Sequence, residues 1–227
     1  MDEVEVLYED NHLIAINKRA GEITQGDKTG DEPLPEKVKR WIKQKYNKPG
    51  NVFCGVIHRI DRPTSGLIML AKTSKGLARM NAMFQKKAIQ KTYWAIVETA
   101  PAAESGTLIN HLKKNEKRNK SGVVNETTEG AKRAELDYKV IAKSDRYTLL
   151  EIDPRTGRHH QIRTQLSHIG CIIKGDLKYG AKRSNKDGSI SLHARAVSFE
   201  HPIKNEPVKI TAPVPNDNLW KWFEKEI

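Results

Sequence analysis

One stretch of the chain, residues 56–73, changes from apolar to strongly polar and back to apolar. Its last part, Leu67–Ala71, is a short continuous apolar run, which is typical of a strand buried on both faces. The sequence PTSG stands directly before that run and favours a tight turn through its proline, its glycine and its hydroxyl side chains. Asp61 precedes the turn. We therefore expect Asp61 on a sharp loop held by a buried strand, a setting that active sites favour.

The charges around Asp61 indicate what its carboxylate can do. Arg59 and Arg62 flank it, and two neighbouring cations favour the ionised form of a carboxylate. An ionised aspartate that is held in position can act as a nucleophile or as an electrostatic stabiliser. Taken alone, the segment has a second interpretation, in which Asp61 only caps the turn and both arginines are solvated or paired with it.

The whole of residues 58–67, HRIDRPTSGL, closely resembles the catalytic motif of the RluA-type family of RNA pseudouridine synthases. Further segments resemble other motifs of that family in the expected order, from about residue 13 to residue 213. These segments are KTYWAIV at 91–97, GRHHQIR at 157–163, IIKGD at 172–176 with YG at 179–180, and LHARAVSF at 192–199 with HP at 201–202. The chain departs from the family at Arg19, where proline is usual, and at His159, where threonine is usual.

The resemblance implies a role for individual residues. It makes Asp61 the nucleophile, places Tyr93 against the target base and pairs Arg163 with the catalytic aspartate. Read alone, Tyr93 would be interpreted as a core tyrosine. We also expect RNA contacts from seven residues of these motifs, namely His58, Arg59, Arg62, Thr64, Arg158, His160 and Gln161.

The implied reaction converts a uridine to pseudouridine and needs no cofactor, because nothing is oxidised and no phosphate is transferred. Asp61 could attack the anomeric carbon, act through a glycal intermediate or add to the uracil ring, and the sequence leaves all three routes open. Two other functions compete: an RNA-binding protein without catalysis, and a glycosidase or nucleosidase. The latter would need a second carboxylate beside Asp61, which the motifs do not supply. Three histidines, His159, His160 and His168, could suggest a metal site, but their surroundings are cationic and no metal is expected.

The composition of the chain indicates which binding partner and which cellular compartment to expect. The chain has 227 residues and a formal net charge of +12, which favours a polyanionic partner, nucleic acid first and an acidic membrane surface second. We expect RNA, ribosomal or transfer, as the partner, and no membrane. Cys54 and Cys171 resemble buried small apolar residues, and no signal peptide or bilayer-spanning run occurs, so we expect a cytoplasmic protein. We further expect one catalytic domain over residues 1–227, without the N-terminal RNA-binding module of many relatives, and a monomer.

Two basic segments have no assigned role. The helical spacing of Leu34, Val38 and Ile42 predicts an amphipathic helix whose outer face, within residues 37–48, is rich in lysine and arginine. That face could contact RNA or could simply be solvated. Residues 113–122 are predicted to form a basic, structureless loop that positions RNA through phosphate contacts, and a solvated hairpin tip is the alternative.

The remaining pattern predicts short strands with turns between them and scattered helices. This indicates an α+β fold, a mixed, largely antiparallel β-sheet catalytic domain with flanking helices and loops, as in pseudouridine synthases. We expect Ser74 and Asn218 to cap helices, and Leu219, Trp222 and Phe223 to form the buried stripe of the last helix. The predicted strands are residues 4–7, 13–16, 90–97, 134–141, 147–152, 192–199 and 207–212; the predicted helices run from 34, from 74 to 87, from 162 to 169 and from 218; and a polar loop is predicted at 24–32.

Overall fold

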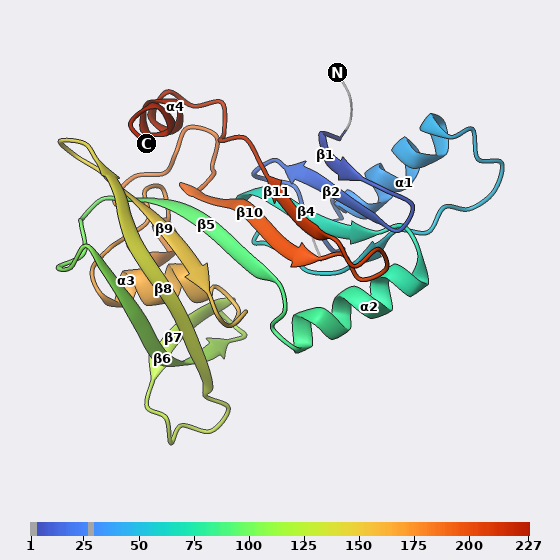
Figure 1. Ribbon diagram of the computed structural model, residues 1–227. Helices are drawn as coiled ribbons and strands as arrows, with labels where there is room; N and C mark the ends of the chain where they lie inside the picture. Colours follow the sequence, from blue (N-terminus) through green and yellow to red (C-terminus); the bar gives the residue numbers. More distant parts are fainter. Residues whose placement is uncertain (1–3, 27–29) are drawn as a thin grey trace. The chain divides into compact units, whose positions relative to one another are not determined.

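The computed structural model describes residues 4–26 and 30–227 (Figure 1). Residues 27–29 of the predicted polar loop therefore lie outside the described residues. The chain divides into two compact units, of which unit 1 comprises residues 1–91 and 194–215 and unit 2 comprises residues 92–193 and 216–227. Among the residues that the structure describes, no helix combines the length and apolar character needed to cross a membrane.

Unit 1 is a sheet in which the strands follow the order β1-β2-β4-β10, with β3 paired to β4 and β11 paired to β10. The registers of β1 with β2, β2 with β4, β3 with β4 and β10 with β11 are all antiparallel. Its elements are β1 (Val6–Glu9), β2 (Leu13–Lys18), α1 (Leu34–Lys45), β3 (Gly55–Val56), β4 (Ser65–Ala71), α2 (Ser74–Gln85), β10 (Leu192–Glu200, of which Leu192 and His193 belong to unit 2) and β11 (Pro207–Thr211).

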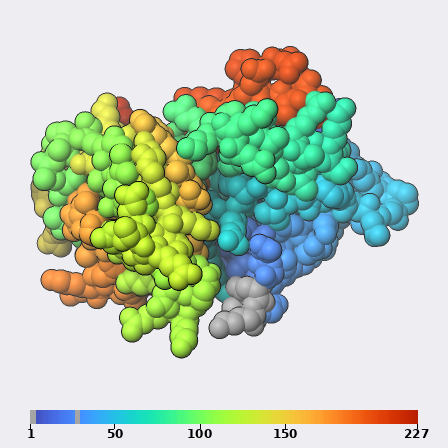
Figure 2. Space-filling model, turned by 90° about the horizontal axis from the view of Figure 1, so that it is seen from below, coloured from blue at the N-terminus to red at the C-terminus, as the bar shows by residue number. Residues whose placement is uncertain are grey.

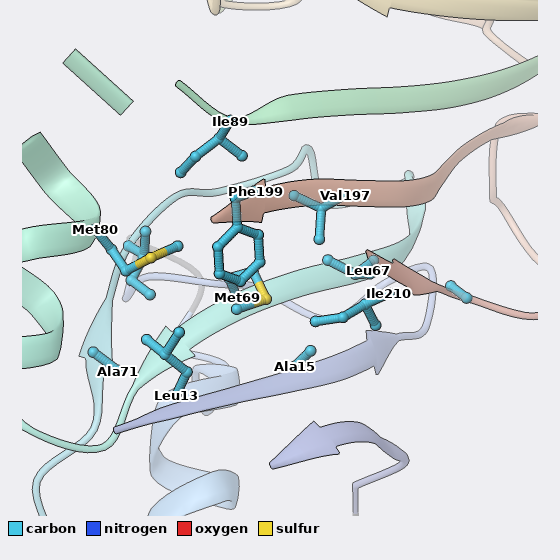
Figure 3. Packing of buried hydrophobic residues seen from close by; sticks show 12 residues of the cluster. Leu13, Ala15, Leu67, Met69, Ala71, Met80, Ile89, Val197, Phe199 and Ile210 are labelled. Carbon is cyan, nitrogen blue, oxygen red and sulfur yellow. The ribbon is translucent and has the colours of Figure 1, made fainter. Parts of the chain in front are cut away.

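One apolar cluster covers one of the two faces of strand β4 (Figure 3). Leu67, Met69 and Ala71 alternate along the strand, so their side chains point to the same face. They pack in a cluster with Met80 of α2 and Phe199 of β10, and all five residues are at most 6% exposed. The other residues of the strand, Ile68 and Leu70, therefore point to its opposite face.

A second cluster covers that opposite face. Ile68 and Leu70 pack with Val38 and Ile42 of α1, and none of the four is more than 1% exposed. The prediction of a strand buried on both faces is confirmed. Because close-packed cores resist displacement, the two clusters fix the beginning of β4, where the Asp61 loop joins it.

Unit 2 contains the strand order β5-β9-β8-β6-β7, and every register in it is antiparallel. Helix α3 packs through Ile162 and Leu166 against a cluster that includes Ala95, Val97 and Leu150 of β5 and β9. Its elements are β5 (Gln90–Val97, beginning in unit 1), β6 (Ser105–Asn115), β7 (Lys120–Val124), β8 (Lys132–Lys143), β9 (Thr148–Pro154), α3 (Gln161–His168), the 3-10 turn η1 (Leu177–Tyr179) and α4 (Asn218–Lys225). The predicted α+β class with a mixed, largely antiparallel sheet is confirmed.

The prediction that residues 113–122 form a structureless loop is wrong. Strand β6 continues to Asn115 and β7 begins at Lys120, so the two strands form a hairpin that is closed by the four residues 116–119. The prediction failed because lysine and asparagine weaken a strand signal. All eleven residues of β6 nevertheless pair with β8 or β7 in the sheet, including the three that lie in the predicted loop.

Helix caps were predicted one residue too late. In α2 the cap is Thr73, whose Oγ1 accepts a hydrogen bond from the backbone N–H of Gly76 at 3.0 Å, and the predicted cap Ser74 is the first helical residue. In α4 the carboxylate of Asp217 accepts from the N–H groups of the second and third helical residues. The buried residues of α4 are consequently Trp220 and Phe223, whereas the predicted Leu219 is half-buried and Trp222 is 39% exposed.

Candidate active site

Asp61 lies in the loop between β3 and β4 of unit 1 and is half-buried. Its backbone carbonyl accepts a hydrogen bond from the N–H of Thr64 at 3.0 Å, which closes the turn. Gly66 follows with a φ of +108°, and a Cβ atom there would lie 2.4 Å from the carbonyl oxygen of Ala194. Only glycine fits so close to the neighbouring backbone. The predicted sharp loop at the beginning of a buried strand is confirmed.

Lys18, at the end of β2, ties the Asp61 loop to the turn that follows β2. Its side chain is buried, and its Nζ donates to the carbonyls of Arg19 and Glu22 at 2.9 Å and of Arg62 at 3.2 Å. The carbonyl of Arg62 also accepts from the N–H of Gly21 at 2.8 Å. These bonds join the two turns, so the backbone beside Asp61 is held from a second direction.

Lys18 also places a buried cation near Asp61. Burial lowers the pKa of Lys18 to about 8, and the carboxylates of Glu22 and Asp61 oppose that shift. At neutral pH the ammonium is therefore mostly charged and acts electrostatically on Asp61. Sequence reasoning missed Lys18 as a site residue. The signal was a lysine that ends an apolar strand, and this pattern alone does not distinguish a buried lysine from a solvated one.

The two arginines beside Asp61 are both exposed. An Nη of Arg59 lies 3.4 Å from Oε1 of Gln25, and Arg62 forms an ion pair with Asp31 at 2.6 Å. Exposed side chains held by such contacts can exchange their partners for phosphate at little cost.

His58 and Thr64, two of the predicted RNA contacts, are part of the framework of the loop. Nε2 of His58 accepts from the N–H of Met69 at 3.0 Å, and its ring lies beside that of Phe84. Burial lowers the pKa of His58 to about 3, with a further contribution from the charge of Lys91, so the ring is neutral at physiological pH. The side chain of Thr64 is buried, and its hydroxyl has no hydrogen-bond partner among residues 4–26 and 30–227.

Arg163, on α3 of unit 2, forms a buried ion pair. Its Nε donates to Oδ2 of Asp176 at 2.6 Å and one Nη donates to Oδ1 at 2.8 Å. Arg163 is 4% exposed and Asp176 is 1% exposed, so each buried charge is compensated by the other and not by water. The guanidinium carbon also lies 5.0 Å from the ring centre of Tyr179. The expected pairing of Arg163 with Asp61 would join units 1 and 2 and stays a prediction.

Tyr179 connects this ion pair to the turn that precedes α3. Its hydroxyl lies 3.0 Å from Nδ1 of His160, accepts from the N–H of Ser121 at 2.9 Å and lies 3.2 Å from Oγ1 of Thr164. Burial raises the pKa of Tyr179, so the hydroxyl stays protonated. His160, the residue directly before α3, has a φ of +53°, and its ring is stacked on that of His159 with 3.8 Å between the ring centres.

His160 is expected to make the protein sensitive to acid. Burial lowers its pKa to about 2, with the charge of Arg163 adding to the effect, whereas an unfolded histidine titrates near 6.5. Below pH 6.5 the unfolded chain binds a proton at His160 that the folded chain excludes, so His160 contributes a fall in stability of about 1.4 kcal/mol per pH unit. Urea unfolding of His160→Gln between pH 6.5 and pH 5 should show a slope smaller by that amount. Equal slopes for wild type and His160→Gln would contradict the prediction.

The remaining predicted residues of unit 2 divide into two groups. Gln161 is buried, and its amide accepts from Thr156 and from the N–H of Arg158 and donates to the carbonyl of Glu135, so it shapes the turn. Arg158 is exposed and bonds through Nε to the carbonyl of Arg133 at 2.9 Å.

Tyr93, the fourth residue of β5, is half-buried and packs against the cluster that contains Ile162 of α3. The predicted shared face of Tyr93, Ala95 and Val97 is confirmed, because all three belong to this cluster. Unit 2 thus brings Tyr93 and the helix that carries Arg163 onto one core.

Comparisons with known proteins place this chain among the RNA-modifying isomerases. The family model for RNA pseudouridylate synthase matches residues 12–168, so the chain belongs to that family, and the RluA-type resemblance is confirmed. Members of this family isomerise uridine in RNA.

Named relatives agree with this assignment. The chain is 32% identical to an RNA pseudouridine synthase of Chlorobaculum parvum over 94% of its own length and 72% of the relative. It is 32% identical to ribosomal large subunit pseudouridine synthase C of Vibrio vulnificus, over 92% of the chain and 65% of the relative. Among solved structures, human RNA pseudouridylate synthase domain containing 4 has the same fold, with a TM-score of 0.79, 21% identity, and coverage of 98% of this chain and 92% of the human one.

Proposed function

We propose that this protein isomerises a specific uridine of ribosomal or transfer RNA to pseudouridine, with Asp61 as the nucleophile, Arg163 orienting it and Tyr93 lying against the base. The observation that carries the proposal is the construction of the Asp61 loop. A doubly covered strand, a glycine that admits no side chain and a buried lysine all act to fix the position of one carboxylate. Such preorganisation is what a nucleophile requires.

The reaction rearranges one nucleoside and is balanced in atoms and electrons. The bond between N1 of uracil and the anomeric carbon breaks, the base turns within the site, and C5 bonds to the anomeric carbon. C5 then loses its proton, and N1 gains one. If Asp61 attacks the sugar, the carboxylate stabilises the positive charge that develops there, as it does in glycosidases. Tyr93 would stack on the base and could serve in the proton transfer at C5.

Arg59 is proposed to act in base flipping. A uridine inside folded RNA must leave the stack, at a cost of roughly a few kcal/mol, and the exposed Arg59 beside Asp61 could fill the space or hold the phosphate. Arg59→Ala should reduce kcat/KM about tenfold or more on structured RNA and far less on an unstructured oligonucleotide. Equal losses on both substrates would refute the flipping role.

Direct nucleoside analysis tests the proposed function. Ribosomal and transfer RNA that lack pseudouridine are incubated separately with the protein, digested to nucleosides and separated by chromatography. The relatives that are named for the ribosomal large subunit make ribosomal RNA the first pool to examine. We expect pseudouridine to appear in one pool at the expense of an equal amount of uridine. Unchanged uridine in both pools would count against the proposal.

A further inference from the structure

The two basic segments of the chain differ in how their charges are balanced. On α1 of unit 1, four of the five basic side chains pair with a neighbouring carboxylate, and one of these carboxylates, Glu9, is shared with Lys72. The ion pairs are Lys37 with Glu22 at 2.9 Å, Lys39 with Glu36 at 2.8 Å, Arg40 with Glu32, and Lys45 with Glu9 at 2.5 Å. Of the five basic residues of this helix, Lys43 alone has no carboxylate partner among the described residues. These ion pairs make the net field that the helix presents to a polyanion weaker than its five basic residues alone would give.

The tip of the β6–β7 hairpin of unit 2 retains its charge. Residues 113–119 are all exposed, in the part of the chain that is light green in Figure 2. Residues 113–120 contain five basic side chains and one acidic one. Glu116 pairs with Lys114 at 2.6 Å. Lys113, Lys117 and Arg118 have no carboxylate partner in the described part of the chain. Several uncompensated cations on one exposed element are the arrangement that binds consecutive phosphates.

Hydrogen bonds fix this hairpin to the turn before α3. Ser121 is 3% exposed, and its Oγ donates to the carbonyl of His159 at 2.7 Å and lies 2.9 Å from Nδ1 of the same residue. The N–H of Ser121 donates to the hydroxyl of Tyr179, whose ring lies 4.7 Å from Nζ of Lys120. Lys178 donates to the carbonyl of Asn119 at 3.2 Å. The hairpin thus shares contacts with the network that holds Arg163.

Arg158 extends the basic surface from the hairpin along the sheet. It is exposed, and its Nε bonds to the carbonyl of Arg133 on β8, which lies opposite His111 of β6 in the sheet. No carboxylate partner of Arg158 occurs among the residues that the structure describes. Arg158 itself belongs to the turn between β9 and α3, so a phosphate that it bound would lie beside that turn.

We propose that the hairpin tip, residues 113–120, together with Arg158 and Lys178 is the surface that docks the RNA backbone, and that Ser121 sets its position. The basic face of α1 is not part of this surface. The inference rests on the proposed function for its substrate. RNA fits better than an anionic membrane, because residues 113–120 contain no apolar side chain that could enter a bilayer.

A matched pair of triple variants tests the surface. One is Lys113→Gln, Lys117→Gln, Arg118→Gln on the hairpin, and the other is Lys39→Gln, Arg40→Gln, Lys43→Gln on α1, so that each removes three positive charges. RNA affinity is measured at several salt concentrations. The hairpin variant should lose at least tenfold in affinity, and the slope of log K against log salt should become shallower by about two, whereas the α1 variant should change affinity less than twofold.

Three outcomes would overturn the proposal. Equal losses for both variants would mean that only net charge matters, and a larger loss for the α1 variant would move the surface to α1. Loss of binding to phosphatidylserine vesicles with RNA affinity unchanged would assign the hairpin to a membrane. If the wild type forms no pseudouridine and the hairpin variant still loses RNA affinity selectively, the docking surface stands and the proposed function fails.

Ser121→Ala tests the positioning role. It removes the two Oγ contacts and leaves every hairpin charge in place, so we expect KM for RNA to rise at least threefold with kcat within twofold of wild type. A merely structural loss would instead lower the melting temperature and the fraction of active protein, with KM unchanged, and that result would contradict the role of Ser121.

Discussion

Arg163→Met is expected to lower the free energy of unfolding by about 3–5 kcal/mol, because it leaves the carboxylate of Asp176 buried without its cation. Asp176 is 1% exposed and receives two hydrogen bonds from the guanidinium, so water cannot replace the lost partner. For a chain of this length the loss corresponds to a fall in melting temperature of about 10 °C. Differential scanning calorimetry or urea unfolding measures it.

The double variant Arg163→Met, Asp176→Asn separates stability from catalysis. Removing the charge at Asp176 should recover most of the lost stability, because no unpaired ion is then buried. Turnover should stay low in the double variant if Arg163 orients the nucleophile. A double variant that regains both stability and turnover would show that Arg163 only holds the fold of unit 2.

Asp61→Asn should lower turnover by about 10,000-fold or more, because an amide cannot serve as the nucleophile and the reaction has no other route of comparable rate. The substitution keeps the shape of the side chain. The backbone of the loop is held by Lys18, Gly66 and the packed strand β4, so the circular dichroism spectrum should be unchanged. Nucleoside analysis of RNA treated with each protein measures the effect. Glu22→Gln serves as the control, because it removes the other carboxylate near Lys18. It should retain turnover within about tenfold of wild type.

The elements that were predicted correctly are those with a strong local signal. The run Leu67–Ala71 is apolar at every position, so its burial could be predicted without knowing what covers it. The helix at α1 follows from the spacing of Val38 and Ile42. Motif resemblance selected Asp61, Tyr93 and Arg163, which lie in the loop before β4, within β5 and in the first turn of α3.

The features that could not be predicted depend on contacts between distant parts of the chain. Nothing local marks Asp176 as the partner of Arg163, since 13 residues separate them and the chain between them must turn first. Lys18 is buried because three carbonyls from two separate turns converge on it. The hairpin charges of Lys113 and Lys117 resemble those of α1 in the sequence, and the difference arises from the carboxylates that surround α1 in space.

The measurement that tests the central claim most directly is tritium release under single-turnover conditions. RNA labelled with uridine tritiated at C5 is mixed with excess wild-type protein or with Asp61→Asn, and the tritium that enters water is counted. Forming the new bond at C5 must expel that tritium, so the wild type should release one equivalent for each uridine converted and Asp61→Asn should release none. Release by Asp61→Asn at the wild-type rate would contradict the assignment of Asp61 as the nucleophile.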